Sequence, residues 1–148
     1  MKALVLYDSI YGNTKMIAET ISSALGKDVK VVSVTDTNPK TLERIDLIVV
    51  GSPIIAWKPS EKMGIFLAGL CAGQLKGLQA ATFDTRVKMF IHGDAAKKIS
   101  QALETAGAKI IVESQVFYVK GRQGPLFEGE VEKAAEWATA IKNAFTPK

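Results

Sequence analysis

The amino-acid sequence predicts an α/β fold, a three-layer sandwich in which helices cover both faces of a five-stranded parallel sheet. Short runs rich in β-branched residues alternate with longer segments whose apolar residues recur at helical spacing, and this alternation is typical of βαβ units. The short runs are almost wholly apolar, as parallel strands buried on both faces are. The chain has 148 residues, 47% of them hydrophobic, so we expect a single domain spanning residues 1–148.

The five expected strands are residues 3–7, 30–34, 47–50, 80–83 and 109–118. Four apolar stripes of helical period predict helices around residues 17–25, 63–71, 99–106 and 131–141. Asp94 is expected to cap the third of these helices, and Gly26 and Gly107 to end the first and the third. The connection over residues 35–44 contains Asn38-Pro39 and is expected to be a turn or a short helix.

Composition excludes several classes of protein. Cys71 is the only cysteine and His92 the only histidine. An intrachain disulfide is therefore excluded, and we expect no metal site. The net charge of +4 favours acidic partners or anions. The lysines are scattered and form no dense basic block, so we expect no nucleic acid as partner. The longest apolar stretch, residues 47–57, is broken by Gly51-Ser52-Pro53 and is too short to span a membrane. Without a signal peptide at its start, the chain is expected to be cytoplasmic.

The loop after the first strand is a candidate anion site. The first N–H groups of a helix lack intrahelical partners and lie at the positive end of its dipole, so they bind phosphate. Ser9, Thr14 and the amide of Asn13 would add side-chain donors. A capped turn with no ligand is the equally simple alternative. The loop lacks the P-loop motif and has only one glycine of a dinucleotide fingerprint.

The loop after the third strand supplies a second signal. Residues 51–60 carry Trp57 between two prolines, Pro53 and Pro59. Parallel sheets bind ligands at the carboxyl ends of their strands, beside the point where the strand order reverses. An aromatic side chain on a stiffened loop at that edge suits stacking on a planar ligand. A third segment at the same edge is residues 84–93.

Two motifs resemble the flavodoxin family. The run YDSIYGNT at residues 7–14, followed by Ala18 and Ile21, is similar to its FMN phosphate-binding signature. The run DLIVVGSP at residues 46–53 resembles its third strand and flavin-contacting loop. The resemblance implies flavodoxin-like strand order 2-1-3-4-5, with FMN as cofactor at the switch between the first and third strands.

The resemblance also implies a set of cofactor-binding residues and no catalytic ones. The phosphate loop would comprise Ser9, Ile10, Tyr11, Gly12, Asn13 and Thr14. The flavin ring would be enclosed by Ser52, Pro53, Ile54, Ile55, Ala56, Trp57, Asp84, Thr85 and Arg86.

The segment after the fourth strand departs from the family pattern. Many members have a tyrosine over the flavin there, whereas this chain has Asp84, Thr85 and Arg86. If Arg86 faces the ring, it would stabilise negative charge on the reduced flavin and make that couple less negative than in acidic relatives. The alternative is that Arg86 pairs with Asp84 at the surface.

The resemblance implies an electron-transfer protein that shuttles electrons between redox partners. With its basic charge, the chain would meet a donor and an acceptor through their acidic docking faces, and we expect it to be a monomer. One alternative is an FMN-dependent oxidoreductase acting on a quinone or a porphyrinogen, with Arg86 or His92 orienting the substrate. The other is a flavodoxin-like module that has lost FMN.

Overall fold

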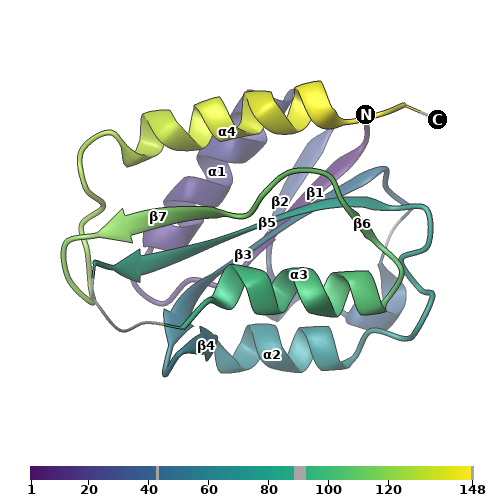
Figure 1. Ribbon diagram of the computed structural model, residues 1–148, viewed down its shortest axis with the longest axis horizontal. Coiled ribbons are helices and arrows are strands. Elements are labelled where there is room, and N and C mark those ends of the chain that lie inside the picture. Colours follow the sequence, from purple (N-terminus) through teal and green to yellow (C-terminus); the bar gives the residue numbers. More distant parts are fainter. Residues whose placement is uncertain (43, 89–92, 148) are drawn as a thin grey trace.

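The computed structural model describes residues 1–42, 44–88 and 93–147, and it has the predicted three layers. In Figure 1, α1 (Asn13–Leu25) and α4 (Glu130–Ala144) lie on one face of the sheet, and α2 (Glu61–Ala68) and α3 (Ala95–Thr105) lie on the other. The prediction of helices on both faces is therefore confirmed. Within the described ranges, no helix combines the length and the hydropathy that a membrane span requires.

The central strands pair in parallel in the predicted order. The sheet runs β2 (Val29–Ser33), β1 (Ala3–Tyr7), β3 (Leu47–Ile55), β5 (Gln79–Val87) and β6 (Lys109–Ile110). The strand β7 (Gln115–Val119) continues the outer position and also pairs with β5. Because β1 lies between β2 and β3, the strand order reverses there, and the switch point is the gap between β1 and β3.

The fifth predicted strand, residues 109–118, is not continuous. It is split into β6 and β7 by residues 111–114, of which the Ile111 N–H still donates to the Ala80 carbonyl of β5 at 3.0 Å, whereas Glu113 and Ser114 form hydrogen bonds to side chains. The Ser114 hydroxyl shares a 2.9 Å hydrogen bond with the Thr82 hydroxyl, and the Trp137 indole N–H donates to the Glu113 carbonyl at 3.3 Å. Contacts to α4 and to the neighbouring strand therefore interrupt a run that looked uniform in sequence.

Two other strands are longer than expected. The expected strand 47–50 continues to Ile55, and the expected strand 80–83 continues to Val87. Residues 52–55 and 84–86, which were placed on loops, therefore lie on strands, where parallel pairing between Ser52 and Asp84 and between Pro53 and Thr85 holds them together. This pairing makes that end of the sheet more rigid than loops would be.

Each sheet face has its own apolar core. The core under α1 and α4 contains Phe83, Phe117 and Trp137, whose rings meet edge to face at centroid distances of 5.7 to 6.2 Å. Trp137 is thus a packing residue, as its helical position predicts. The core under α2 and α3 is aliphatic, apart from Phe66.

The helix ends follow the sequence in part. Asp94 caps α3 by accepting the Lys97 N–H at 2.9 Å, and Gly26 ends α1. Gly107 follows the end of α3 with φ 109°. However, α2 ends at Ala68, so the expected helix 63–71 is too long, and Cys71 is exposed beyond it.

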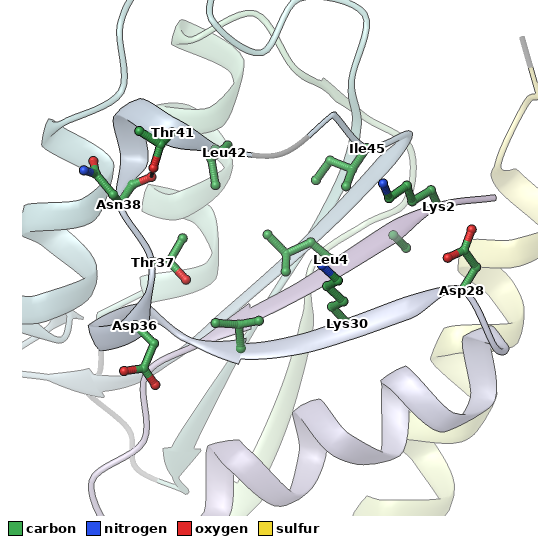
Figure 2. Close-up of a pocket in the computed structure, with 12 residues that line it drawn as sticks. Lys2, Leu4, Asp28, Lys30, Asp36, Thr37, Asn38, Thr41, Leu42 and Ile45 are labelled. Atoms are coloured by element: carbon green, nitrogen blue, oxygen red, sulfur yellow. Dashed lines mark hydrogen bonds between the residues drawn. The ribbon is translucent and has the colours of Figure 1, made fainter.

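The second connection leaves a cavity beside the sheet edge. This connection has two short 3₁₀ helices, Val34–Asp36 and Pro39–Thr41, in place of an α-helix. A turn or a short helix was expected over residues 35–44. They cover β1 and β2 incompletely and leave a cavity of about 240 Å³. Its lining includes the apolar Leu4, Val32 and Leu42 together with polar residues. Figure 2 shows this cavity. This cavity lies away from the switch point.

Candidate functional site

A second cavity, of about 390 Å³, lies at the carboxyl edge of the sheet, where the ends of β3 and β5 meet the loops after β1 and β7. Figure 1 shows this edge of the sheet. Its volume falls within the roughly 300–1,000 Å³ of small-molecule sites. It is lined by Ser9, Ile10, Tyr11, Asn13, Thr14, Pro53, Ile54, Ile55, Ala56, Thr85, Arg86, Val87, Val119 and Arg122.

Residues 9–12 form the turn that precedes α1, and Asn13 and Thr14 are the first residues of the helix. Gly12 precedes the helix with φ 95°, a left-handed conformation that costs glycine little and other residues more. The Ser9 hydroxyl accepts the N–H groups of Gly12 at 3.1 Å and Lys15 at 3.3 Å. Within the described chain, the N–H groups of Asn13 and Thr14 have no protein acceptor, so two helix-start donors remain available at this end of the cavity.

Thr14 joins this loop to the end of β5. Its hydroxyl shares a 2.8 Å hydrogen bond with the Thr85 hydroxyl, and both side chains are buried. A hydroxyl has one donor and two acceptor positions, so this bond uses only part of the capacity of the pair. The two residues were assigned to different parts of the site, and the structure places them side by side.

Residues 54–59 form a tight hairpin rather than a loop. Ile54 pairs with Pro59 and Ile55 with Lys58 of the short strand β4 (Lys58–Pro59), which leaves Ala56 and Trp57 as a two-residue turn. Both turn residues have positive φ, 48° and 75°, as a type I′ turn requires. Asparagine and glycine are usual at such positions, so alanine and tryptophan hold the turn at a cost of about 1–2 kcal/mol each.

Trp57 does not line the cavity. Its side chain is 58% exposed at the tip of the hairpin, and the cavity wall there consists of Ile54, Ile55 and Ala56. A Cβ atom at Gly93 would lie 1.8 Å from the Trp57 carbonyl oxygen, so only glycine allows this close approach. The hairpin is thus packed against the segment that precedes α3.

Arg86 and Asp84 form a buried ion pair at the end of β5. The guanidinium donates from Nε to Asp84 Oδ1 at 2.8 Å and from Nη2 to Asp84 Oδ2 at 2.5 Å, with side-chain exposures of 5% and 0%. Asp84 Oδ2 also accepts the Ala96 N–H in the first turn of α3 at 2.9 Å. The alternative that Arg86 pairs with Asp84 is therefore confirmed, although the pair is buried and not at the surface.

The pKa of Arg86 is raised. Burial acts to lower this pKa, but the hydrogen bond and charge of Asp84 outweigh it, with smaller contributions from Asp94 and Tyr118. Asp94 Oδ1 lies 3.6 Å from Arg86 Nη2. Arg86 therefore remains charged over the ordinary pH range, and its charge is compensated by neighbouring carboxylates.

Most of the predicted site residues meet at one cavity, and four do not line it. Gly12 shapes the helix start, and Trp57 is exposed at the tip of the hairpin. Ser52 is buried and accepts the Ser60 N–H at 3.0 Å, and Asp84 lies behind Arg86. His92 and the rest of residues 89–92 lie outside the described residues.

Three lining residues were missed by the sequence analysis. Val87 ends β5, Val119 ends β7, and Arg122 lies in the loop after it. The available signal was position alone, since a loop after a final parallel strand opens at the same edge as the others. The Gly121-Arg122-Gln123-Gly124-Pro125 composition marks a turn but carries no binding motif.

The cavity has two different ends at the switch point of a doubly wound sheet. Helix-start N–H groups and hydroxyls lie at one end, and the apolar hairpin lies at the other. This arrangement is characteristic of α/β proteins that bind a mononucleotide.

The sequence of the chain matches a known protein family. Residues 4–118 match the family model described as "Flavodoxin domain". The chain belongs to the flavodoxin family, and the family indicates FMN as its cofactor. No curated protein sequence matches the chain.

Solved structures with the same fold include two flavodoxins of Bacillus cereus. Oxidised flavodoxin 1 superposes with a TM-score of 0.86 at 19% identity, covering 99% of this chain and 100% of that one. Oxidised flavodoxin 2 gives 0.84 at 24% identity, covering 98% and 100%. Rubredoxin:oxygen oxidoreductase of Desulfovibrio gigas gives 0.79 at 16% identity, covering 97% of this chain and 36% of that one. The fold thus occurs both as a separate flavodoxin and within a longer oxidoreductase.

Proposed function

We propose that the chain is a one-domain FMN-containing electron carrier that passes electrons between redox proteins. When FMN is bound, it supplies the electron-transfer chemistry, and the protein supplies binding and orientation. The family supports either an electron carrier or a flavodoxin-like oxidoreductase. The choice between them rests on the side chains that line the cavity.

The cavity lining favours the carrier. Within the described chain, its ionisable side chains are those of Tyr11, Arg86 and Arg122. Arginine and tyrosine side chains are seldom the general acid or base of an enzyme that works near neutral pH. None of the described residues that line the cavity is a carboxylate, a histidine or a thiol suited to general acid–base catalysis on a substrate.

The residues fit the two parts of FMN. The free N–H groups of Asn13 and Thr14, with the hydroxyls of Ser9 and Thr14, would hold the phosphate. Pro53, Ile54, Ile55 and Ala56 would contact one face of the ring system, with Thr85 and Arg86 beside it. Gly12, Ser52, Trp57 and Asp84 would support the site from outside the cavity.

The partners would be redox proteins with acidic docking faces. Exposed Ile10, Tyr11 and Trp57 lie around the cavity, and exposed cations on the adjoining segments include Lys15 and Lys58. Apolar contact area with surrounding positive charge suits an acidic partner and speeds its encounter. We further propose that the protein acts as a cytoplasmic monomer, with neither a membrane nor nucleic acid as partner.

Anaerobic reduction of the FMN-loaded protein tests this function. We expect the purified protein to bind FMN, to take up electrons in steps, and to pass them to an acceptor redox protein. With a quinone or a porphyrinogen alone, we expect no sustained turnover. Such turnover would favour the oxidoreductase, and a colourless protein that takes up no FMN would favour the module that has lost its cofactor.

A further inference from the structure

We propose that Arg122 is a phosphate-recognising residue of the cofactor site. This inference rests on the proposed function, because it assumes that FMN occupies the cavity with its phosphate at the start of α1. It adds a charged ligand to a phosphate loop whose other donors are neutral.

Arg122 lies on a closed and well-bonded turn. The loop after β7 folds back so that Val119 bridges Leu126, and the Lys120 N–H donates to the Pro125 carbonyl at 2.8 Å. Inside this closure, the Gly124 N–H donates to the Gly121 carbonyl at 2.9 Å. Arg122 and Gln123 are therefore the two central residues of a hydrogen-bonded turn.

This turn is fastened to the phosphate loop. The Asn13 side-chain amide donates to the Gln123 carbonyl at 3.2 Å. Gly124 has φ 102°, and a Cβ atom there would lie 2.6 Å from Asn13 Oδ1. A residue adjacent to Arg122 thus contacts the first residue of α1, and Arg122 lines the cavity together with Ser9, Tyr11 and Thr14.

Among the described residues, no carboxylate forms an ion pair with Arg122. In the described ranges, ion pairs join Arg86 to Asp84 and Asp94, and Lys133 to Glu130. Arg122 takes part in none of these pairs, and its side chain is exposed at the cavity. Of the two arginines in the lining, Arg86 is already bonded to a carboxylate, whereas Arg122 is available to an anion.

The chemistry of a phosphomonoester matches this cation. The phosphate carries about two negative charges above its second pKa of about 6, and a guanidinium binds two of its oxygens in a fork. The two charges meet in a partly exposed cavity, so we expect a moderate gain in FMN affinity, about tenfold.

The test compares FMN with riboflavin, which has the same ring and no phosphate. Apoprotein is titrated with each flavin, and binding is followed by the change in flavin fluorescence. For Arg122→Gln we expect about tenfold weaker FMN binding and an unchanged affinity for riboflavin. Lys120→Gln, which removes one charge from the same loop outside the cavity, should change neither affinity, and Arg122→Lys should recover part of the FMN affinity.

The pH and salt dependence sharpen the result. The difference between wild type and Arg122→Gln should be larger at pH 7.5 than at pH 5, where the phosphate has lost one negative charge. It should also shrink as salt rises.

Two results would overturn the assignment of Arg122. The first is an equal loss of affinity for FMN and for riboflavin in Arg122→Gln. That result would mean that the side chain contacts the ring or stabilises the loop. The second is an affinity of Arg122→Gln for FMN equal to that of the wild type. Failure of the wild type to bind either flavin would instead overturn the proposed function, and this inference with it.

Discussion

The two walls of the cavity differ in how they are built. The loop wall, residues 9–14 and 119–125, consists of backbone N–H groups, hydroxyls and one exposed cation held by turns. The strand wall, residues 53–56 and 85–87, consists of paired strands and the first residue of a strained hairpin turn, and Arg86 in it pairs with the buried Asp84 behind it. The loop wall offers hydrogen-bond donors to a ligand, whereas the polar groups of the strand wall are bonded to other groups of the protein.

This difference indicates a division of roles. Groups left free in the loop wall are suited to set cofactor affinity, because a ligand satisfies them. Groups in the strand wall already have partners, so they set the shape and the electrostatics of the ring site. A pair of charges that compensate each other contributes a dipole instead of a net charge. The expected shift of the flavin couple by Arg86 is therefore smaller than an unpaired arginine would give.

The largest expected effect comes from breaking the strand wall at its ion pair. Asp84→Asn removes the main counter-charge of the buried Arg86 and should lower the free energy of unfolding by about 3–5 kcal/mol. Urea unfolding of the apoprotein measures it. Asp94→Asn is the matched control, because Asp94 also faces Arg86 but its side chain is 52% exposed. Asparagine still caps α3, so this loss should be at most about 1 kcal/mol. Equal losses for the two variants would show that burial of the pair is unimportant.

A smaller effect is expected where the two walls meet. Thr14→Val keeps the shape of the side chain but leaves the buried Thr85 hydroxyl without this partner, at a cost of about 1–3 kcal/mol. The double variant with Thr85→Val should be less destabilised than the sum of the single ones, since neither hydroxyl then remains. Thermal or urea unfolding of all three variants gives the coupling energy. Simple additivity would show that the hydroxyls do not stabilise each other.

The smallest effect should be a gain at the hairpin turn. Asparagine tolerates positive φ better than alanine does, so Ala56→Asn should stabilise the apoprotein by about 0.5–1 kcal/mol. The same substitution at Ala140, on the exposed face of α4, should have the opposite sign because asparagine is a poorer helix former. Urea midpoints distinguish the two cases. A loss of stability at Ala56 would mean that the turn favours alanine for another reason.

The two walls also differ in how far the sequence predicted them. The strand, the turn with Gly12 and the helix start over residues 3–14 were predicted because their geometry is local in the chain, and their binding of a phosphate stays a prediction. The alternation of apolar runs with helical periods predicted the parallel sheet, whereas the order of its central strands came from the resemblance to the flavodoxin family and is confirmed. FMN as the cofactor followed from these motifs and agrees with the family.

Tertiary contacts account for the errors. Residues 52–55 and 84–86 form strands because they pair with each other, which turn-forming residues such as Pro53 concealed. Trp57 was expected to lie on a loop, but it is the second residue of a two-residue hairpin turn with its side chain exposed. Arg122 reaches the cavity only because a loop distant in sequence bonds to Asn13, and no local pattern encodes that bond.

The two tryptophans give the protein a pair of native fluorophores with separate environments. Trp137 is 7% exposed, among the rings of the core, whereas Trp57 is 58% exposed beside the cavity. Emission from the first responds to unfolding, and emission from the second responds to whatever covers the hairpin tip. Replacing one tryptophan at a time would therefore allow folding and partner docking to be followed independently, without an attached label.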